Sequence, residues 1–492
     1  MKRCAVVGAG IAGLSAALYL SRDPGFQVEV FEKNGSPGGK AGVLSVGDFH
    51  FDSGPTIVTL PFVLEDLFSS LGEDPAARLQ FIKLEIPCRY YYPDGTVFKA
   101  YADPERLCGE IGEVFRDDPE SMRRYLAYSR NIYDLTSELF LFGSFHEWRR
   151  IRRAAPQGLW SSFKKIDPFR TMHDANRSFF RDKRIVQFLD RYATYNGSDP
   201  YRAPATLNVI PHVEQLGVYV PRGGIRAIPR AMHEAARKRN IVFHLGTRVD
   251  RIRIEGNRVR GILTGGTFRA YDVVVSNADV RTTYLDLLGE RFSLGSLKYR
   301  HLEPSSSAVI FYWGIANRTP LEMHNILFSS DYRREFREIF FRRLCPEDPT
   351  VYIHISQRYC PGDCPEGMEN WYVMVNAPWD SGQDWRREAG RLRARILEKI
   401  KKTLQLDLGG LIVAEKFHTP PDIARQTSSA LGSLYGISSN RRISAFLRQG
   451  NRSGRIRGLY FCGGSAHPGG GVPLCVLSGK ITAELVREHE RC

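Results

Sequence analysis

The feature that most constrains the fold is the run Gly8-Ala9-Gly10-Ile11-Ala12-Gly13, which directly follows an apolar segment at residues 2–7. In this spacing the first glycine permits a tight turn, the second lets a phosphate approach the backbone, and the third allows a helix to pack closely on a strand. Residues 12–21 are rich in Ala and Leu and predict that helix. With a second predicted strand at 27–31, they form a βαβ unit whose helix N-terminus can bind phosphate.

Two further features support a dinucleotide site at this end of the chain. Glu32 follows the second strand, 19 residues after Gly13, where a carboxylate can accept hydrogen bonds from ribose hydroxyls. The run Gly38-Gly39-Lys40 then offers a second close approach to a pyrophosphate, with Lys40 as its counter-charge. Taken alone, this run would favour a flexible turn with a surface lysine.

The remaining elements predict an α/β fold in which a Rossmann-like domain is interrupted by a second domain. Short strands return at 240–276, and a last strand and helix follow at 458–461 and 473–488. Other segments predict helices between 104 and 195 and at 385–403, and strands at 305–316 and 351–357. We expect 1–75, 205–280 and 415–492 to form the nucleotide-binding domain, and 76–204 and 281–414 to form a mixed sheet-plus-helix region that binds substrate and contacts a membrane.

Composition narrows the possible partners. Lys and Arg number 69 against 54 Asp and Glu, a formal net charge of +15, but the sequence contains no nucleic-acid motif, so we expect no nucleic-acid partner. The segment 121–165 interleaves basic and bulky apolar residues, including Trp148-Arg149-Arg150-Ile151-Arg152-Arg153, Trp160 and Phe163. It fits either a solvated basic helix or an amphipathic surface lying on an anionic membrane. Nine scattered Cys predict a reducing, cytoplasmic setting and no metal site.

Several motifs together resemble one family. They are "GAGIAGLSAALYL", "VEVFEKNGSPGGKAG", "FDSGPTIV" and the segments 221–232, 274–279, 324–332, 432–440 and 463–474. This set resembles the bacterial carotenoid desaturases, which are phytoene-desaturase-like flavoproteins. The segments 432–440 and 463–474 look like the branch that acts on 1-hydroxy- or 1-methoxycarotenoids, the 3,4-desaturases.

The resemblance implies FAD as the cofactor and assigns residues to it. The residues implied around its ADP part are Gly8, Gly10, Ile11, Ala12, Gly13, Glu32, Lys33, Gly39 and Lys40, with the backbone of Val249 at the adenine. Those implied along the ribityl chain and isoalloxazine are Gly463, Gly464, Val472 and Pro473. Many relatives carry an acidic residue where this chain has Ser465, which leaves one ribityl contact in doubt. Because the sequence holds one dinucleotide fingerprint, we expect electrons to leave the flavin for oxygen or a membrane quinone.

The predicted reaction is hydride transfer from an acyclic carotenoid to flavin N5, with loss of a proton from the neighbouring carbon. His467 is the candidate base, although a histidine in His-Pro-Gly-Gly-Gly can equally serve only to shape the loop. We expect 3,4-desaturation of a 1-hydroxylated or 1-methoxylated carotenoid. The alternatives are oxidation of a terminal methyl group, phytoene-type multi-step desaturation and redox-neutral isomerisation. A substrate of this kind also predicts peripheral attachment to the cytoplasmic membrane.

Overall fold

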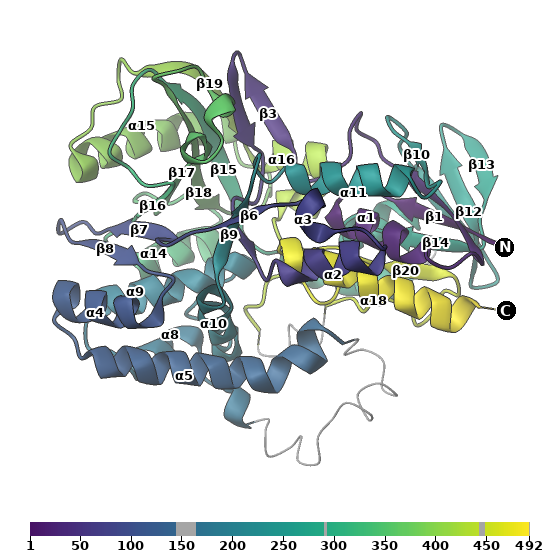
Figure 1. The fold of residues 1–492 in the computed structure, drawn as a ribbon, viewed down its shortest axis with the longest axis horizontal. Coiled ribbons are helices and arrows are strands. Elements are labelled where there is room, and N and C mark those ends of the chain that lie inside the picture. The colour runs from purple at the N-terminus through teal and green to yellow at the C-terminus, as the bar shows by residue number, and fades with distance from the viewer. Residues whose placement is uncertain (144–163, 290–292, 442–447, 492) are drawn as a thin grey trace.

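The computed structural model describes residues 1–143, 164–289, 293–441 and 448–491. Figure 1 shows two lobes, one of which carries both ends of the chain. The predicted basic and aromatic run Trp148–Arg153, together with Trp160 and Phe163, lies outside the described residues.

The first lobe is built on a parallel sheet whose strands come from three distant parts of the chain. Its order is β10 (Val242–His244), β2 (Phe26–Phe31), β1 (Lys2–Val7), β14 (Val273–Ser276) and β20 (Leu459–Phe461). All four pairings are parallel. These strands fall within the three segments predicted for the nucleotide-binding domain, whose exact boundaries remain a prediction.

The two faces of this sheet are covered by different layers. Cys4 and Val6 of β1 pack with helices α1 (Ile11–Leu20), α11 (Ala227–Arg237) and α18 (Val472–Glu490). Ala5 and Val7 face the antiparallel strands β11 (Arg251–Glu255), β12 (Arg258–Thr264) and β13 (Thr267–Ala270). Successive side chains of a strand point to opposite faces. Because both faces of β1 are covered, all of its inward side chains are apolar. The predicted α/β, Rossmann-like fold is confirmed.

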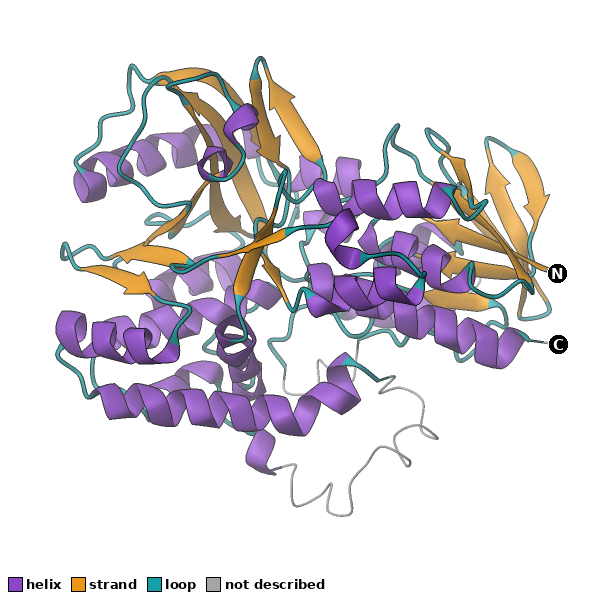
Figure 2. Ribbon diagram, in the orientation of Figure 1, coloured by secondary structure: helices purple, strands orange, loops and turns teal. Residues whose placement is uncertain are grey.

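The second lobe contains a mixed sheet of seven strands. Its order is β19 (Ile412–His418), β15 (Ser307–Ile315), β18 (Glu369–Ala377), β17 (Val351–Ile355), β16 (His324–Leu327), β7 (Cys88–Tyr91) and β8 (Val97–Ala100). Only the β16–β7 pair is parallel. Helix α15 (Trp385–Leu404) covers one face with the stripe Leu392, Ile396 and Ile400, as its periodicity predicts. Figure 2 shows this helix on one side of the sheet, with the other helices of the lobe beyond its far edge.

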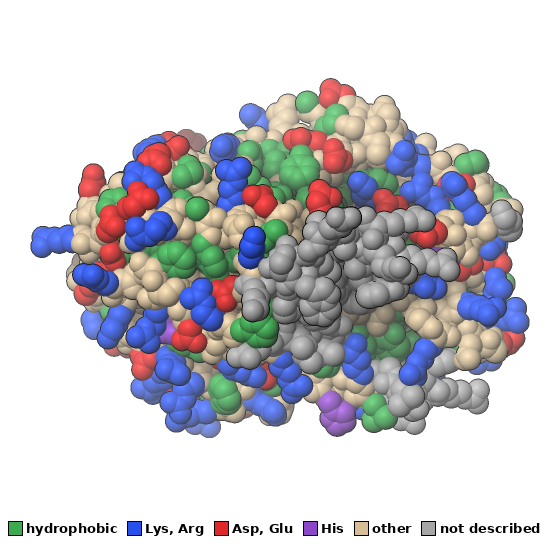
Figure 3. Space-filling view, turned by 90° about the horizontal axis from the view of Figure 1, so that it is seen from below, with side chains coloured by type: hydrophobic (Ala, Val, Ile, Leu, Met, Phe, Trp, Pro, Cys, Tyr) green, Lys and Arg blue, Asp and Glu red, His purple; other side chains and the backbone are tan. Residues whose placement is uncertain are grey.

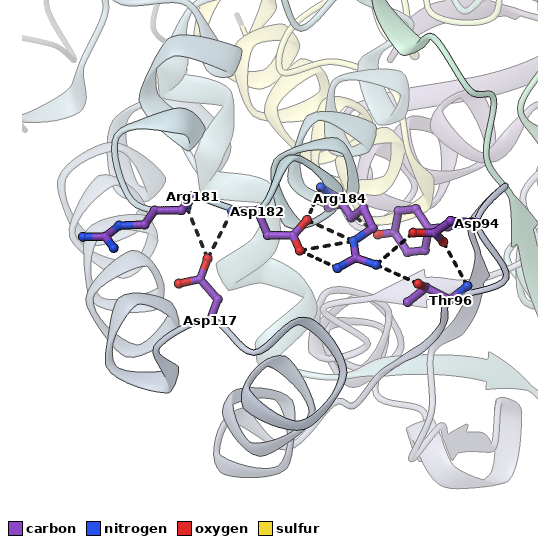
Figure 4. Close-up of polar contacts among 7 residues, drawn as sticks. Asp94, Thr96, Asp117, Arg181, Asp182 and Arg184 are labelled. Carbon is purple, nitrogen blue, oxygen red and sulfur yellow. Dashed lines mark hydrogen bonds and ion pairs between the residues drawn. The ribbon is translucent and has the colours of Figure 1, made fainter.

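A layer of helices lies beside β7 and β8. It comprises α4 (Pro104–Phe115), α5 (Pro119–Thr136), the π-helix η1 (Ser137–Leu141), α8 (Met172–Arg177), α9 (Lys183–Asp190), the 3-10 helix η3 (Arg191–Asn196) and α10 (Val209–Gln215). Figure 4 shows how Arg184 of α9 binds the β7–β8 turn, with Nη1 2.9 Å from Asp94 Oδ2 and 2.7 Å from Thr96 Oγ1. Asp182 caps α9 by accepting the Arg184 N–H. These polar contacts hold the helical layer against the sheet.

The remaining α-helices and β-strands of the described chain are short. They are β3 (Val43–Val46), β4 (Phe49–Asp52), β5 (Val58–Thr59), β6 (Phe81–Lys83), β9 (Val218–Pro221), α2 (Phe62–Ser70), α3 (Pro75–Arg78), α12 (Val280–Thr282), α13 (Ser293–His301), α14 (Tyr332–Arg337) and α16 (Pro420–Thr427). Within the described residues, every helix is too short or too polar to cross a bilayer.

The basic residues of α5 are locally neutralised. Arg123 Nη2 lies 2.7 Å from Glu105, and Arg130 Nε lies 3.6 Å from Asp134. On the face that Figure 3 shows, basic and acidic side chains alternate, with apolar side chains between them. The described part of this region therefore resembles a solvated mixed-charge face, and contact with a membrane stays a prediction.

Candidate functional site

The loop between β1 and α1 requires glycine at positions 8 and 13 and is crowded at position 10. Gly8 has φ +100°, and a Cβ on Gly13 would overlap the backbone carbonyl oxygen of Gly8. A Cβ on Gly10 would lie 2.8 Å from Asn277 Nδ2. No side chain caps α1, and its first turn carries no acidic residue. The N–H groups of Ile11 and Ala12 at this helix start are therefore suited to bind an anion.

Glu32 is buried at the end of β2, where it supports the same loop. Its Oε2 accepts the Ala9 N–H at 2.8 Å, and its Oε1 accepts the Asn34 N–H at 2.9 Å. Each carboxylate oxygen has two lone pairs, so both retain capacity for ribose hydroxyls. The neighbouring Lys33 donates from Nζ to the carbonyl of Arg425, 2.6 Å away.

Gly39 and Lys40 lie directly against this loop. A Cβ on Gly39 would be 3.3 Å from the Cα of Gly10. Lys40 is half-buried, and its Nζ donates to the carbonyl of Leu434 at 2.5 Å. Burial lowers the Lys40 pKa, and the nearby Asp279 carboxylate acts in the opposite direction. The sequence left a surface lysine open as an alternative, and the structure shows instead a desolvated cation.

The chain end returns to the same place and supplies a second helix start. Helix α18 begins at Val472 and Pro473 after Gly471, whose φ is +112°, and no side chain caps it. The N–H of Gly463 donates to Ser478 Oγ at 3.0 Å, which fixes the preceding loop on α18. The two ends of the chain are thus neighbours, and each presents an uncapped helix N-terminus.

One cavity of about 1050 Å³ connects these parts. Of the predicted site residues it is lined by Gly8, Gly10, Ile11, Ala12, Glu32, Lys33, Gly39, Lys40, Val249, Gly463, Gly464, His467, Val472 and Pro473. Gly13 is absent from this lining because its part is to let α1 pack on Gly8. The same cavity continues between apolar and aromatic side chains, among them Leu207, Val213, Ile310, Tyr372 and Met374.

His467 is buried in the loop before α18. Its Nε2 lies 2.8 Å from the carbonyl oxygen of Gly143, and its own carbonyl accepts hydrogen bonds from Asn451 Nδ2 and Ser478 Oγ. A carbonyl only accepts, so Nε2 carries a proton, and Nδ1 is the nitrogen that could accept one in the neutral ring. The ring therefore helps to hold the loop, and its predicted role as a base stays a prediction.

Comparisons with known proteins agree with this geometry. The model of the family "Flavin containing amine oxidoreductase" matches residues 11–487. The chain belongs to this family of flavoproteins. It is 41% identical, over 99% of both chains, to a 1-hydroxycarotenoid 3,4-desaturase of Flavobacterium sp. (strain P99-3). It is 30% identical to a 4,4'-diaponeurosporene oxygenase of Staphylococcus haemolyticus, over 99% of this chain and 98% of the relative.

The fold has known counterparts as well. The structure of an oxidoreductase from Methanosarcina mazei superimposes with a TM-score of 0.65 at 17% identity, covering 98% of this chain and 100% of that one. The resemblance to carotenoid desaturases that the motifs carry is thus confirmed over the whole chain, and the protein is an FAD-dependent oxidoreductase.

The residues around the cavity of this flavoprotein have the shape and charge that FAD needs. The glycine cradle leaves little space for side chains, two uncapped helix starts face one cavity, and the half-buried Lys40 supplies a positive charge. The starts of α1 and α18 and the Lys40 ammonium would hold the negatively charged groups, and Glu32 the ribose. Bound FAD supplies a two-electron acceptor at this site.

Three side chains at the flavoprotein site were not assigned from the sequence. Asn277 lies between the Gly8 and Gly463 loops, since a Cβ on either glycine would come within 3.3 Å of its amide. Arg448 is buried and donates to the carbonyls of Gly464 at 2.6 Å and Tyr435 at 3.2 Å. Burial lowers its pKa to about 10, so it stays charged at neutral pH. Asn277 and Tyr435 belong to the quoted segments 274–279 and 432–440, but no local pattern marks Arg448.

Ser465, which stands where many relatives carry an acidic residue, forms a hydrogen bond within the protein. Its Oγ accepts the N–H of Val280 at 3.0 Å, which ties the C-terminal loop to the start of α12. The hydroxyl therefore supports the site through the backbone of a neighbouring helix.

Proposed function

We propose that this flavoprotein desaturates an acyclic carotenoid that carries a hydroxyl or methoxy group at C1, forming the 3,4 double bond. The observation that carries the proposal is the single cavity, in which a nucleotide cradle continues into an apolar, aromatic compartment. The 41% identity to a 1-hydroxycarotenoid 3,4-desaturase over nearly the full chain supports this substrate class.

The residues of the chain contribute positioning and exclusion of water. Aromatic and aliphatic walls, including Tyr372 and Met374, align a polyene beside the glycine loop that precedes α18. The half-buried Lys40 and the buried Arg448 favour negative charge at that loop. The proton lost from the neighbouring carbon goes to His467 Nδ1 or to water, since an allylic cation needs only a weak base.

Anaerobic single-turnover measurements test the proposal. The holoenzyme is mixed, without oxygen, with a 1-hydroxylated acyclic carotenoid, and flavin absorbance and product mass are followed. We expect the flavin absorption to bleach in proportion to substrate, with a product two hydrogens lighter and a longer conjugated system. An isomerised product with unbleached flavin would contradict desaturation and indicate redox-neutral isomerisation.

Terminal-methyl oxidation is the second candidate, because the chain is also 30% identical to a 4,4'-diaponeurosporene oxygenase. The two reactions differ in the fate of oxygen. A turnover under labelled dioxygen yields an oxygen-containing end group in the second case and an unlabelled, dehydrogenated product in the first.

We further propose that the enzyme acts at the cytoplasmic membrane surface and passes its electrons to oxygen or a membrane quinone. A carotenoid is confined to bilayers, and attachment would rest on apolar contacts with about 1 kcal/mol from each nearby basic residue. Flotation with anionic liposomes tests the attachment. We expect binding that persists in high salt, and a protein that stays unbound at low salt would contradict it.

A further inference from the structure

The apolar compartment of the cavity contains a largely buried polar cluster next to the C-terminal glycine loop, and the cofactor does not explain it. It consists of Arg191, Thr194 and Tyr195 on η3 and Glu214 on α10, all of which line the cavity. Their neighbours along the wall are apolar, among them Leu207, Ile210 and Val213. Polar groups in such a wall are unfavourable unless they are hydrogen-bonded to each other or to a ligand.

The cluster is held in place by its own hydrogen bonds. Tyr195 Oη donates to Glu214 Oε1 at 2.5 Å, and Tyr192 Oη donates to Glu214 Oε2 at 2.8 Å. Burial raises the pKa of both phenols far above the usual value, so they remain donors. Glu214 thus receives two hydrogen bonds and keeps lone pairs that can accept a third.

The same cluster also has unused hydrogen-bonding capacity. Arg191 is buried, and its Nη1 donates to Thr194 Oγ1. Its Nε has no partner among the described residues. The Arg191 guanidinium lines the cavity and has five N–H donors, of which Nη1 already binds Thr194, while Tyr195 Oη and Glu214 can accept. A hydroxyl group, which donates one hydrogen bond and accepts others, matches this arrangement.

The cluster belongs to the part of the cavity next to the C-terminal glycine loop. Gly197 ends η3, and a Cβ there would lie 2.8 Å from the Tyr435 ring. A Cβ on Gly470 of the loop would overlap the same ring. A single aromatic ring thus separates the end of η3 from the loop that leads into α18.

We propose that Arg191, Tyr195 and Glu214 bind the terminal hydroxyl of the substrate and thereby select which carbon–carbon bond is oxidised. The proposal rests on the proposed function and deepens it. In a 1-hydroxylated carotenoid only C2 separates the hydroxyl-bearing carbon from the C3–C4 bond. A group that anchors the hydroxyl beside the loop consequently fixes this bond near the reacting end of the cavity. A hydrocarbon end would leave the cluster unpaired, which disfavours its binding.

The test compares three acyclic carotenoids that differ only at C1, with a hydroxyl, a methoxy group or hydrogen. We measure kcat/KM and product regiochemistry for the wild type, Tyr195→Phe, Glu214→Gln and Arg191→Lys, each checked for flavin content. We expect the wild type to prefer the hydroxylated substrate over the hydrocarbon by at least about tenfold. Each variant should reduce this preference mainly by losing activity on the hydroxylated substrate. Glu214→Gln should narrow the gap between hydroxyl and methoxy, because a methoxy group cannot donate.

A matched control uses a phenol–carboxylate pair outside the cavity. Tyr460 Oη donates to Glu490 Oε1 at 3.0 Å in the first lobe. Tyr460→Phe and Glu490→Gln should keep the wild-type order of substrates. Cluster variants that also keep that order, with normal flavin content, would overturn the proposal.

The proposed function and the subsite fail in different ways. If no carotenoid is oxidised, the proposed function is wrong, and equilibrium binding of the same three compounds, followed by the shift of polyene absorption, still tests the subsite. Equal affinity of the wild type for the hydroxylated and hydrocarbon forms would overturn the subsite even if both are oxidised.

Discussion

At the scale of single residues, two buried histidines in the second lobe make the stability of the protein depend on pH. His324 of β16 and His354 of β17 are register partners, and their rings stack at 4.8 Å. Burial lowers the pKa of His324 to about 3 and that of His354 well below its ordinary value. Both rings are therefore neutral in the folded protein at neutral pH.

This pair predicts loss of stability in mild acid. Between pH 6.5 and about 3 the histidines are protonated in the unfolded chain but neutral in the folded chain. The free energy of unfolding therefore decreases as the pH is lowered. Each histidine contributes about 1.4 kcal/mol per pH unit. The thermal midpoint of His324→Asn should depend less on pH between 7 and 5 than that of the wild type, while the exposed control His489→Asn should not differ. An unchanged slope for His324→Asn would contradict this cause.

At the scale of elements, the contact between α1 and α18 positions both helix starts of the flavin site. Ser15 Oγ of α1 donates to the carbonyl of Val476 at 2.7 Å, and a Cβ on Gly479 would lie 2.5 Å from the carbonyl oxygen of Ala12. The two helices are thus as close as glycine permits, and this distance sets the width of the cradle between them.

Gly479→Ala should separate the helices and weaken flavin binding. We expect a lower thermal midpoint, from overpacking of roughly 1–3 kcal/mol, and faster loss of FAD on dialysis. Gly390→Ala is the matched control, because Gly390 is exposed in the interior of α15 and a methyl group there would meet no neighbouring atom. That variant should equal or slightly exceed the wild type in stability. Retention of flavin by Gly479→Ala at the wild-type level would contradict the role given to this contact.

At the scale of the whole molecule, a partly buried ion pair joins the two lobes. Arg226, which precedes α11, lies with Nη2 2.6 Å from Asp363 Oδ1 in the second lobe, and Asp363 is fully buried. The carboxylate also accepts a hydrogen bond from Ser356. Breaking such a pair leaves a charge without its partner inside the protein.

Asp363→Asn should therefore destabilise the lobe contact by roughly 2 kcal/mol. This is less than for a fully enclosed pair, because about a third of the Arg226 side chain is exposed and Asp52 lies nearby. Thermal unfolding of the holoenzyme measures the effect. Glu105→Gln, which removes the exposed partner of Arg123, is the control and should leave the midpoint unchanged. Equal thermal midpoints for Asp363→Asn and Glu105→Gln would show that the ion pair does not stabilise the contact between the lobes.

Local sequence determined the nucleotide cradle. The glycine spacing, the helix after it and Glu32 lie within one contiguous βαβ unit, and backbone sterics and strand alternation act over that short range, so their roles follow from residue order. The apolar stripe of α15 was predictable for the same reason.

Tertiary structure alone decided the rest of the site. Arg448 and Glu214 lie outside the recognised motifs. Asn277 and Tyr435 lie inside two of them, but their roles in the site come from neighbours far away in the chain. The sequence does not show whether Lys40 lies at the surface or in the interior. In the folded chain it is partly removed from water, which lowers its pKa. Desolvation and hydrogen bonding depend on which segments pack together, and this packing is a property of the folded chain as a whole.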